Sequence, residues 1–146
     1  MKTAYFRSRC LVCWKSFEVP KLSDMSYGET LYYEKSIDEF GYFNWIENQD
    51  KEKIISLFLD TDPELQFKND ETKGNIAVKI IGLIADGDWE PILGHSRCPR
   101  CKYKFNYVSK RRSQIKNINL LSFKSFDVLK EDEQIEYLKE KTKTGL

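Results

Sequence analysis

Short runs of apolar and aromatic residues stand on either side of two CxxC motifs, CLVC near the start of the chain and CPRC near residue 100. Residues 4–6 and 17–19 flank the first motif, and residues 92–93 and 103–108 flank the second. β-Branched and aromatic residues around a short turn are typical of paired strands. The pattern therefore predicts two β-hairpins, each with a CxxC motif at its tip.

The segment between the two motifs carries signals for a strand and a helix. Residues 29–33 have the composition of a short strand, and Gly41 with Asn44 indicates a turn. Residues 48–62 begin with polar and acidic residues, continue with apolar residues at helical spacing and end at Asp62-Pro63. This arrangement predicts a capped amphipathic helix.

Residues 75–85, NIAVKIIGLIA, are apolar at both the strand and the helix period. Ile76, Ile80 and Ile84 would align on one face of a helix as well as on a strand. We favour a buried strand, because the segment is rich in β-branched residues and because Asp86-Gly87 after it is typical of a hairpin turn.

The last residues of the chain predict a final amphipathic helix from about Glu131 to Lys141, which we expect to cover one side of the sheet. At 146 residues the chain can bury one sizeable core. We therefore expect one compact unit of the α+β class.

The composition favours a folded protein with a polar surface. Hydrophobic residues make up 40%, aromatic residues 14% and charged residues 32% of the chain, which excludes a disordered protein. The first residues lack the apolar core of a leader peptide, and no apolar run is long enough to span a bilayer. We expect a cytoplasmic protein with no membrane partner.

Charge is strongly segregated along the chain, although the formal net charge is only +1. Residues 1–22 contain five Lys or Arg and one acid, and residues 91–124 contain nine Lys or Arg and no acid. Residues 23–90 contain six Lys and sixteen acids. The two basic segments are the ones that carry the cysteines.

All four cysteines belong to a repeated pattern, SRCxxCxxxF, with Cys10 and Cys13 in one copy and Cys98 and Cys101 in the other. A CxxC turn brings two thiolates together, and two such turns provide the four ligands of a structural zinc site. Two disulfides or two reactive dithiols are the alternatives. Zinc is favoured because both pairs share spacing and flanking residues, and because paired thiols in a reducing compartment are more often metal ligands.

The pattern resembles the zinc-ribbon modules, in which two hairpin tips face each other across one structural Zn²⁺. The resemblance implies a zinc-ribbon-like pair of β-hairpins from residues 1–22 and 91–110. It also implies a long α+β insertion, residues 23–90, packed on the module, and leaves residues 111–146 as a basic linker and C-terminal helix. The chain departs from the family pattern where Trp14 and Lys102 replace the usual Gly after the second cysteine, and in its much longer spacer.

Catalysis is not expected from this sequence. Four thiolates close the coordination shell, so the metal would stabilise the fold and would not activate water. His95, the only histidine, stands three residues before Cys98 and is a spare ligand or a strand-end residue without a special role. An enzyme that uses carboxylates of the insertion is a second alternative, with these candidates: Asp60, Asp62, Glu64, Asp86, Asp88 and Glu90.

The first functional hypothesis is nucleic-acid binding by the basic face around the CxxC motifs. Cations bind phosphates, and interleaved aromatic residues such as Tyr103 and Tyr107 offer faces to unpaired bases. The cations could instead be shared with the acidic insertion as internal partners. The candidate nucleic-acid contacts are Arg9, Lys15, Arg97, Arg100, Lys102, Lys104, Lys110, Arg111, Arg112 and Lys116.

The alternative is a protein-binding module of the inhibitor, immunity or anti-defence type. In this hypothesis aromatic and acidic side chains of the insertion grip a basic partner protein. An aromatic core with an acidic rim explains the same residues. The candidate contacts are Tyr32, Tyr33, Asp38, Glu39, Tyr42 and Trp45.

Overall fold

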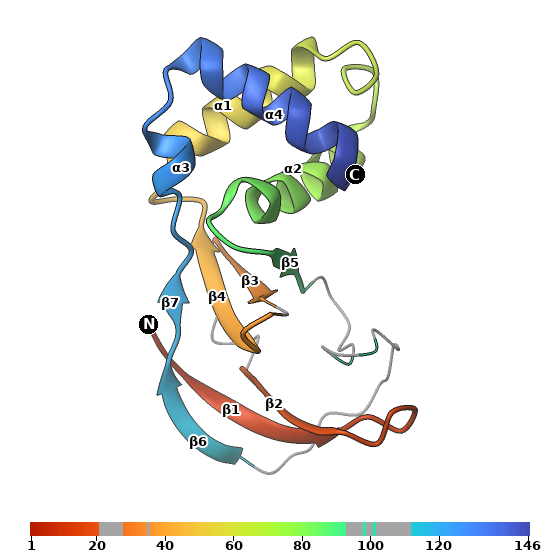
Figure 1. Cartoon of the computed structure of the whole chain (residues 1–146), viewed down its shortest axis with the longest axis vertical. Coiled ribbons are helices and arrows are strands. Elements are labelled where there is room, and N and C mark those ends of the chain that lie inside the picture. Colours follow the sequence, from red (N-terminus) through yellow and green to blue (C-terminus); the bar gives the residue numbers. More distant parts are fainter. Residues whose placement is uncertain (21–27, 35, 93–97, 99–100, 102–111) are drawn as a thin grey trace.

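The structure is a computed structural model, and it describes residues 1–20, 28–34, 36–92, 98, 101 and 112–146 of the chain. These residues form helices and two open β-sheets, which confirms the α+β class. Figure 1 shows three layers along the longest axis of the molecule, with one sheet at the bottom, the second sheet above it and the helices at the top.

The first sheet contains the predicted hairpin around the first CxxC motif. Its strand order is β2-β1-β6, with β1 (Lys2–Arg9) between β2 (Ser16–Pro20) and β6 (Arg112–Asn117). Both pairings are antiparallel, and Arg9 pairs with Ser16 next to the motif. The predicted second hairpin lies mostly outside the described residues. The expected basic linker after residue 110 contributes β6 to this sheet.

The second sheet has the order β5-β3-β4-β7. The hairpin of β3 (Glu29–Glu34) and β4 (Glu39–Asn44) is flanked by β5 (Trp89–Pro91), antiparallel to β3, and by β7 (Asn119–Leu120), parallel to β4. The strand over residues 29–33 is confirmed.

The predicted turn at Gly41 and Asn44 is wrong, because both residues belong to β4. Gly41 is needed for close packing: a Cβ atom there would lie 2.6 Å from Leu121 Cδ2 and 3.0 Å from the Trp89 ring. The turn is made earlier, where the buried Glu34 carboxylate accepts hydrogen bonds from Ser36 N, Ser36 Oγ and Ile37 N.

Three long helices, α1 (Gln49–Thr61), α2 (Asp70–Ile84) and α4 (Glu131–Gly145), pack against one another above the second sheet (Figure 1). The short α3 (Lys124–Asp127) precedes α4. The predictions of α1 and α4 are confirmed; α4 packs on α1 and α2, and its Leu138 belongs to the same buried cluster as Tyr32 and Phe43 of the second sheet. None of the helices in the described ranges is both long and apolar enough to cross a bilayer.

The strand favoured for residues 75–85 is wrong, since residues 75–84 form the last part of α2 and Ala85 is its C-cap. The helix starts before them: Asn69 caps it by accepting a hydrogen bond from Thr72 N at 2.8 Å. Ile80, Ile81 and Ile84 are fully buried. A Cβ atom on Gly82 would lie 2.5 Å from the Trp89 carbonyl oxygen, so the helix backbone packs directly against β5.

Among the described residues, buried apolar side chains form two separate clusters. The larger cluster joins α1, α2 and α4 to the second sheet through residues such as Tyr32, Phe43 and Leu138. The smaller cluster consists of Cys10, Phe17 and Cys98, with Cys13 and Val19 packed against it. The edge-to-face contact of Tyr5 with Phe40, 6.1 Å between ring centroids, links the two sheets.

Asp86 fastens the start of α3 to the loop that follows α2. Its carboxylate accepts hydrogen bonds from Ser122 Oγ at 2.8 Å, Lys124 N at 2.7 Å and Ser125 N at 3.2 Å. Partial burial raises the pKa of Asp86, but these hydrogen bonds outweigh it and lower the pKa from an ordinary 3.8 to about 2.

Replacing Asp86 by Ala is expected to lower the free energy of unfolding by about 1 kcal/mol at neutral pH, the typical cost of losing a helix-capping side chain. Because the folded pKa is the lower one, the stabilisation is complete above pH 4 and disappears as the pH falls to about 2. Urea unfolding across this range measures both effects. Asp88→Ala, at an exposed neighbour, is the control, and equal losses in both variants would contradict the role of Asp86.

Candidate metal centre

The four cysteine sulfurs meet at one place, although 84 residues separate Cys13 from Cys98. Cys10 Sγ lies 3.5 Å from Cys101 Sγ, and Cys13 Sγ lies 3.6 Å from Cys98 Sγ. All four sulfurs are within 4.8 Å of one another. Sulfurs bound tetrahedrally at about 2.3 Å from one ion stand about 3.8 Å apart, so this group could hold a single metal ion. The predicted meeting of the four cysteines is confirmed.

The first CxxC motif is a tight turn at the end of the β1–β2 hairpin. Cys10 N donates to the Lys15 carbonyl oxygen at 3.1 Å, and Trp14 N donates to the Cys10 carbonyl oxygen at 2.9 Å. Inside this turn Val12 N and Cys13 N point at Cys10 Sγ, at 3.4 and 3.5 Å. The backbone therefore both fixes the turn and directs two donors at one sulfur.

The second motif repeats one of these contacts. Cys101 N lies 3.5 Å from Cys98 Sγ, in the same relation that Cys13 N has to Cys10 Sγ. The first cysteine of each motif is fully buried, whereas Cys13 is half-buried and Cys101 is exposed. The two motifs thus share this backbone-to-sulfur contact, and each has its first cysteine buried.

The surroundings of Cys10 favour its thiolate form. The N–H of Cys13 has the largest effect on the pKa of Cys10; burial opposes it, and the N–H of Val12 and the neighbouring thiols of Cys101 and Cys13 support it. Together they lower the pKa of Cys10 from 9.0 to about 6. The thiolate is the form that binds metal ions.

Trp14, directly after the second cysteine of the first motif, adopts a left-handed backbone with φ of 61°. This conformation is the one that a Gly at the same place supplies most easily. The departure from the zinc-ribbon pattern at Trp14 therefore leaves the turn geometry intact. Its energetic cost is of the order of 1 kcal/mol for a residue with a side chain.

The apolar side chains of the first motif point into solvent. Leu11 is 63%, Val12 53% and Trp14 66% exposed. We call these three residues the knuckle tip. Sequence reasoning did not assign it a function; the available signal was the large aromatic residue at a position that usually holds Gly.

The predicted nucleic-acid contacts are only partly within the described residues. Arg9 and Lys15 are exposed beside the first motif, and Arg112 is the first residue of β6. Arg97, Arg100, Lys102, Lys104, Lys110 and Arg111 lie outside the described residues, as do His95, Tyr103 and Tyr107.

Lys116 is engaged within the first sheet. Its ammonium group lies 2.9 Å from Glu18 Oε2 and 4.9 Å from the centre of the Tyr5 ring. Arg7 is the second cation near Glu18, at 3.8 Å. Glu18 is the sole acid of residues 1–22, so two cations of the sheet already balance it.

The two central aromatic residues of the alternative, protein-binding surface are buried in the structure. Tyr32 is fully buried and donates to the Val78 carbonyl oxygen, and Tyr33 is 3% exposed and donates to Asp38 Oδ1. Tyr42 is half-buried, and Trp45 is half-buried against the large cluster and donates to Thr30 Oγ1. Asp38 and Glu39 are exposed.

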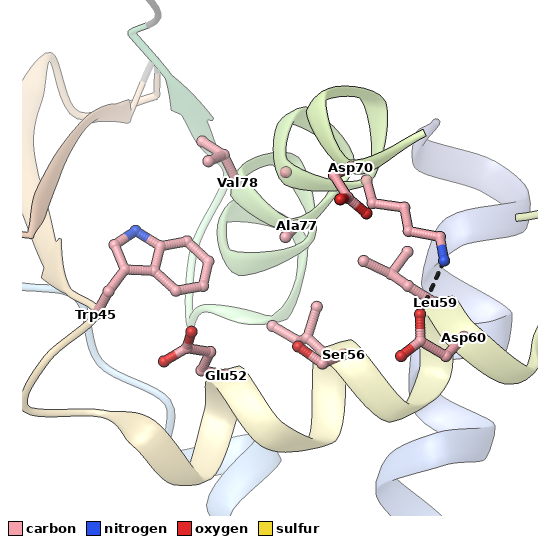
Figure 2. Close-up of a pocket in the computed structure, with 11 residues that line it drawn as sticks. Trp45, Glu52, Ser56, Leu59, Asp60, Asp70, Ala77 and Val78 are labelled. Atoms are coloured by element: carbon pink, nitrogen blue, oxygen red, sulfur yellow. Dashed lines mark hydrogen bonds and ion pairs between the residues drawn. The ribbon is translucent and has the colours of Figure 1, made fainter. Parts of the chain in front are cut away.

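Three of the carboxylates considered for catalysis have structural partners. Asp60 pairs with Lys73 at 2.8 Å, Asp62 accepts hydrogen bonds from the N–H groups of Glu64 and Leu65, and Asp86 holds α3. A cleft of about 380 Å³ lies between α1 and α2. Figure 2 shows Trp45 at one end of the cleft and Asp60, which pairs with Lys73, at the other. Neither histidine nor cysteine is among the described residues that line it.

Comparison with protein-family models, with curated proteins and with solved structures found no match. The likeness to zinc ribbons therefore rests on the spacing of the cysteines and on the geometry of the two turns.

The left-handed backbone at residue 14 predicts a contrast between two substitutions. Trp14→Gly should leave the thermal midpoint and the metal content unchanged or slightly raise the midpoint, because Gly adopts positive φ without strain. Trp14→Val should lower stability by about 1 kcal/mol or more, because a β-branched residue is disfavoured there. Thermal unfolding followed by circular dichroism measures this contrast, and equal midpoints for the two variants would refute it.

Proposed function

We propose that this protein is a non-enzymatic recognition module built around one structural Zn²⁺, and that its basic face around the two CxxC motifs binds nucleic acid. The observation that supports it most directly is the meeting of Cys10 and Cys13 with Cys98 and Cys101, since each pair belongs to one of the two basic segments. A metal shared by the two motifs would make one continuous cationic surface from two distant parts of the chain.

Zinc fits the donor set best. Four thiolates are typical of structural zinc sites, and soft sulfur ligands disfavour magnesium and calcium. A complete set of four protein ligands leaves no position for a reacting water, which is why a structural role is proposed.

Limited apolar packing at this place also supports a metal. Among the described residues, the small cluster has Cys10, Phe17 and Cys98 as its buried members. Burial of one large apolar side chain contributes about 1.5–3 kcal/mol, which is comparable to the entropy cost of ordering one or two residues. Metal–sulfur bonds would therefore add substantially to the order of the first CxxC turn, residues 10–15, which we call the knuckle.

The charges of the first motif support a phosphate-binding role. Residues 10–17 contain no acid, and Arg9 and Lys15 are exposed on either side of the turn. Within the described part of the chain, no ion pair joins Arg9 or Lys15 to an acid of residues 28–92. Among the described residues, the sharing of charge with the acidic insertion therefore does not extend to these two cations.

Native mass spectrometry is expected to find one Zn²⁺ per chain, which Cys98→Ser should abolish. After chelation, hydrogen exchange should accelerate at residues 10–17 and remain slow in α1 and α4, because the large cluster contains no metal ligand. A chain without bound metal, or a knuckle equally protected before and after chelation, would contradict the zinc assignment.

The double variant Arg9→Ala with Lys15→Ala removes the two exposed cations and is expected to weaken binding of a fluorescent oligonucleotide at least several-fold. It should also reduce the slope of log K against log salt concentration by about 1 for each lost phosphate contact. Fluorescence anisotropy at several salt concentrations measures both quantities. Lys139→Ala with Lys143→Ala on α4 changes the net charge equally and serves as the control. Equal losses in the two double variants would indicate a general charge effect and refute the assigned face.

A further inference from the structure

The knuckle tip gathers three large apolar side chains within four residues, each more than half exposed. Isolated exposed apolar residues are common on protein surfaces, but such a group at the end of one rigid turn is typical of a contact surface. The tip lies directly between the two exposed cations Arg9 and Lys15 in the sequence.

Trp14 occupies a backbone position that glycine adopts with less strain. With φ of 61° its backbone is strained, and 66% of its side chain gains nothing from burial. A strained, exposed aromatic residue contributes little to stability, so its place in the turn is explained by a contact made with another molecule.

The turn holds the Trp14 backbone in place before any ligand binds. Trp14 N donates to the Cys10 carbonyl oxygen, and the hydrogen bond from Cys10 N to the Lys15 carbonyl oxygen closes the turn behind it. Cys13, directly before Trp14, belongs to the sulfur cluster. An aromatic ring on a fixed backbone loses little conformational freedom on binding, which raises its contribution to affinity.

We propose that Trp14 stacks on an unpaired base and that the chain therefore prefers single-stranded nucleic acid to duplex. This inference rests on the proposed nucleic-acid function and names its substrate class. The faces of bases are accessible in single strands and hidden in a duplex, whereas phosphates are available in both. Arg9 and Lys15 contact the phosphates that flank the stacked base, and Leu11 with Val12 covers its apolar edge.

The charge around the turn favours a nucleic acid over a protein partner with an apolar groove. Residues 10–17 contain one charged residue, Lys15, which is a cation, and the other residues besides Trp14 and Ser16 are apolar or cysteine. Cations on both sides of an exposed aromatic ring match a base between two phosphates.

The test measures the affinity of the zinc-loaded protein for fluorescein-labelled oligothymidylate and oligouridylate, and for a duplex of equal length, by anisotropy. A length of about twelve nucleotides lies within the usual site size of roughly 4–16 nucleotides. The variant is Trp14→Gly, which suits the left-handed backbone, with Trp14→Tyr as a conservative rescue. Phe67→Gly removes an 87% exposed aromatic ring elsewhere and is the matched control.

The wild-type protein is expected to bind the single strands about tenfold more tightly than the duplex. Trp14→Gly should lower single-strand affinity about tenfold, the effect of losing one stacked base, and leave duplex affinity and metal content unchanged. Trp14→Tyr should retain most of the affinity, and Phe67→Gly all of it. The ratio of the two single-strand affinities shows whether DNA or RNA is preferred.

Two results overturn the inference in different ways. Salt-dependent binding that is equal for single strands and duplex, or that Trp14→Gly leaves unchanged, refutes base stacking while the proposed nucleic-acid function stands. If the zinc-loaded protein binds neither the single strands nor the duplex at low salt, both proposals fail together.

Discussion

The contact between the two pairs of cysteines closes a span of 84 residues and brings to one place the two CxxC motifs, which belong to separate basic segments of the sequence. Closing a flexible loop of this length costs roughly 4 kcal/mol in chain entropy. The folded segment between the motifs reduces this cost, because β5 pairs with β3 and returns the chain toward the first sheet. The strand that follows the second motif, β6, then pairs with β1 next to the first motif. Ordinary strand pairing therefore helps to bring the sulfurs together, and a bound metal ion would add its bonds to this arrangement.

The segment from β6 to β7 connects the first sheet, which carries the first CxxC motif, to the second sheet and the helices. Between the two strands stands Ile118, which is 1% exposed and exchanges backbone hydrogen bonds with Met1 at the end of the first sheet. Two residues later Leu120 pairs with Tyr42 in the second sheet. One short stretch of chain thus fixes the first sheet relative to the second, as Figure 1 shows along one side of the molecule. The edge-to-face contact of Tyr5 with Phe40 adds a second link between the sheets.

The sequence allowed correct prediction of features that depend on local patterns and failed where long-range packing decides. The cysteine repeat, the first hairpin, α1 and α4 all carry strong local signals, and the structure agrees with each of them. The strand predicted for residues 75–85 rests on their β-branched content and on Asp86-Gly87, and it overlooks Asn69, which caps the helix six residues earlier. Gly41 indicated a turn locally, whereas its real constraint is the distant side chain of Leu121.

Strand β6 had no detectable signal, because its sequence RSQIKN contains one apolar residue and that residue, Ile115, is 55% exposed. An edge strand of this kind is held by backbone hydrogen bonds to its neighbour and not by an apolar face, so periodicity cannot reveal it. The left-handed backbone at Trp14 was equally hidden. Positive φ is usually read from Gly or Asn in a sequence, and here a tryptophan occupies the position.

The two clusters separate the residues that hold the fold from those to which we assign a binding role. Among the described residues, the large cluster draws on α1, α2, α4 and the second sheet, and none of its members is a candidate metal ligand. Its burial can hold the fold irrespective of the metal, since the hydrophobic contribution scales with the apolar area that is buried. Among the described residues, the small cluster has few apolar members and contains two of the four cysteines. In the proposed metal-bound protein, metal loss would therefore disturb local order at the first CxxC turn and leave the large cluster in place, so that its effect would be confined to the surface that carries Arg9, Trp14 and Lys15.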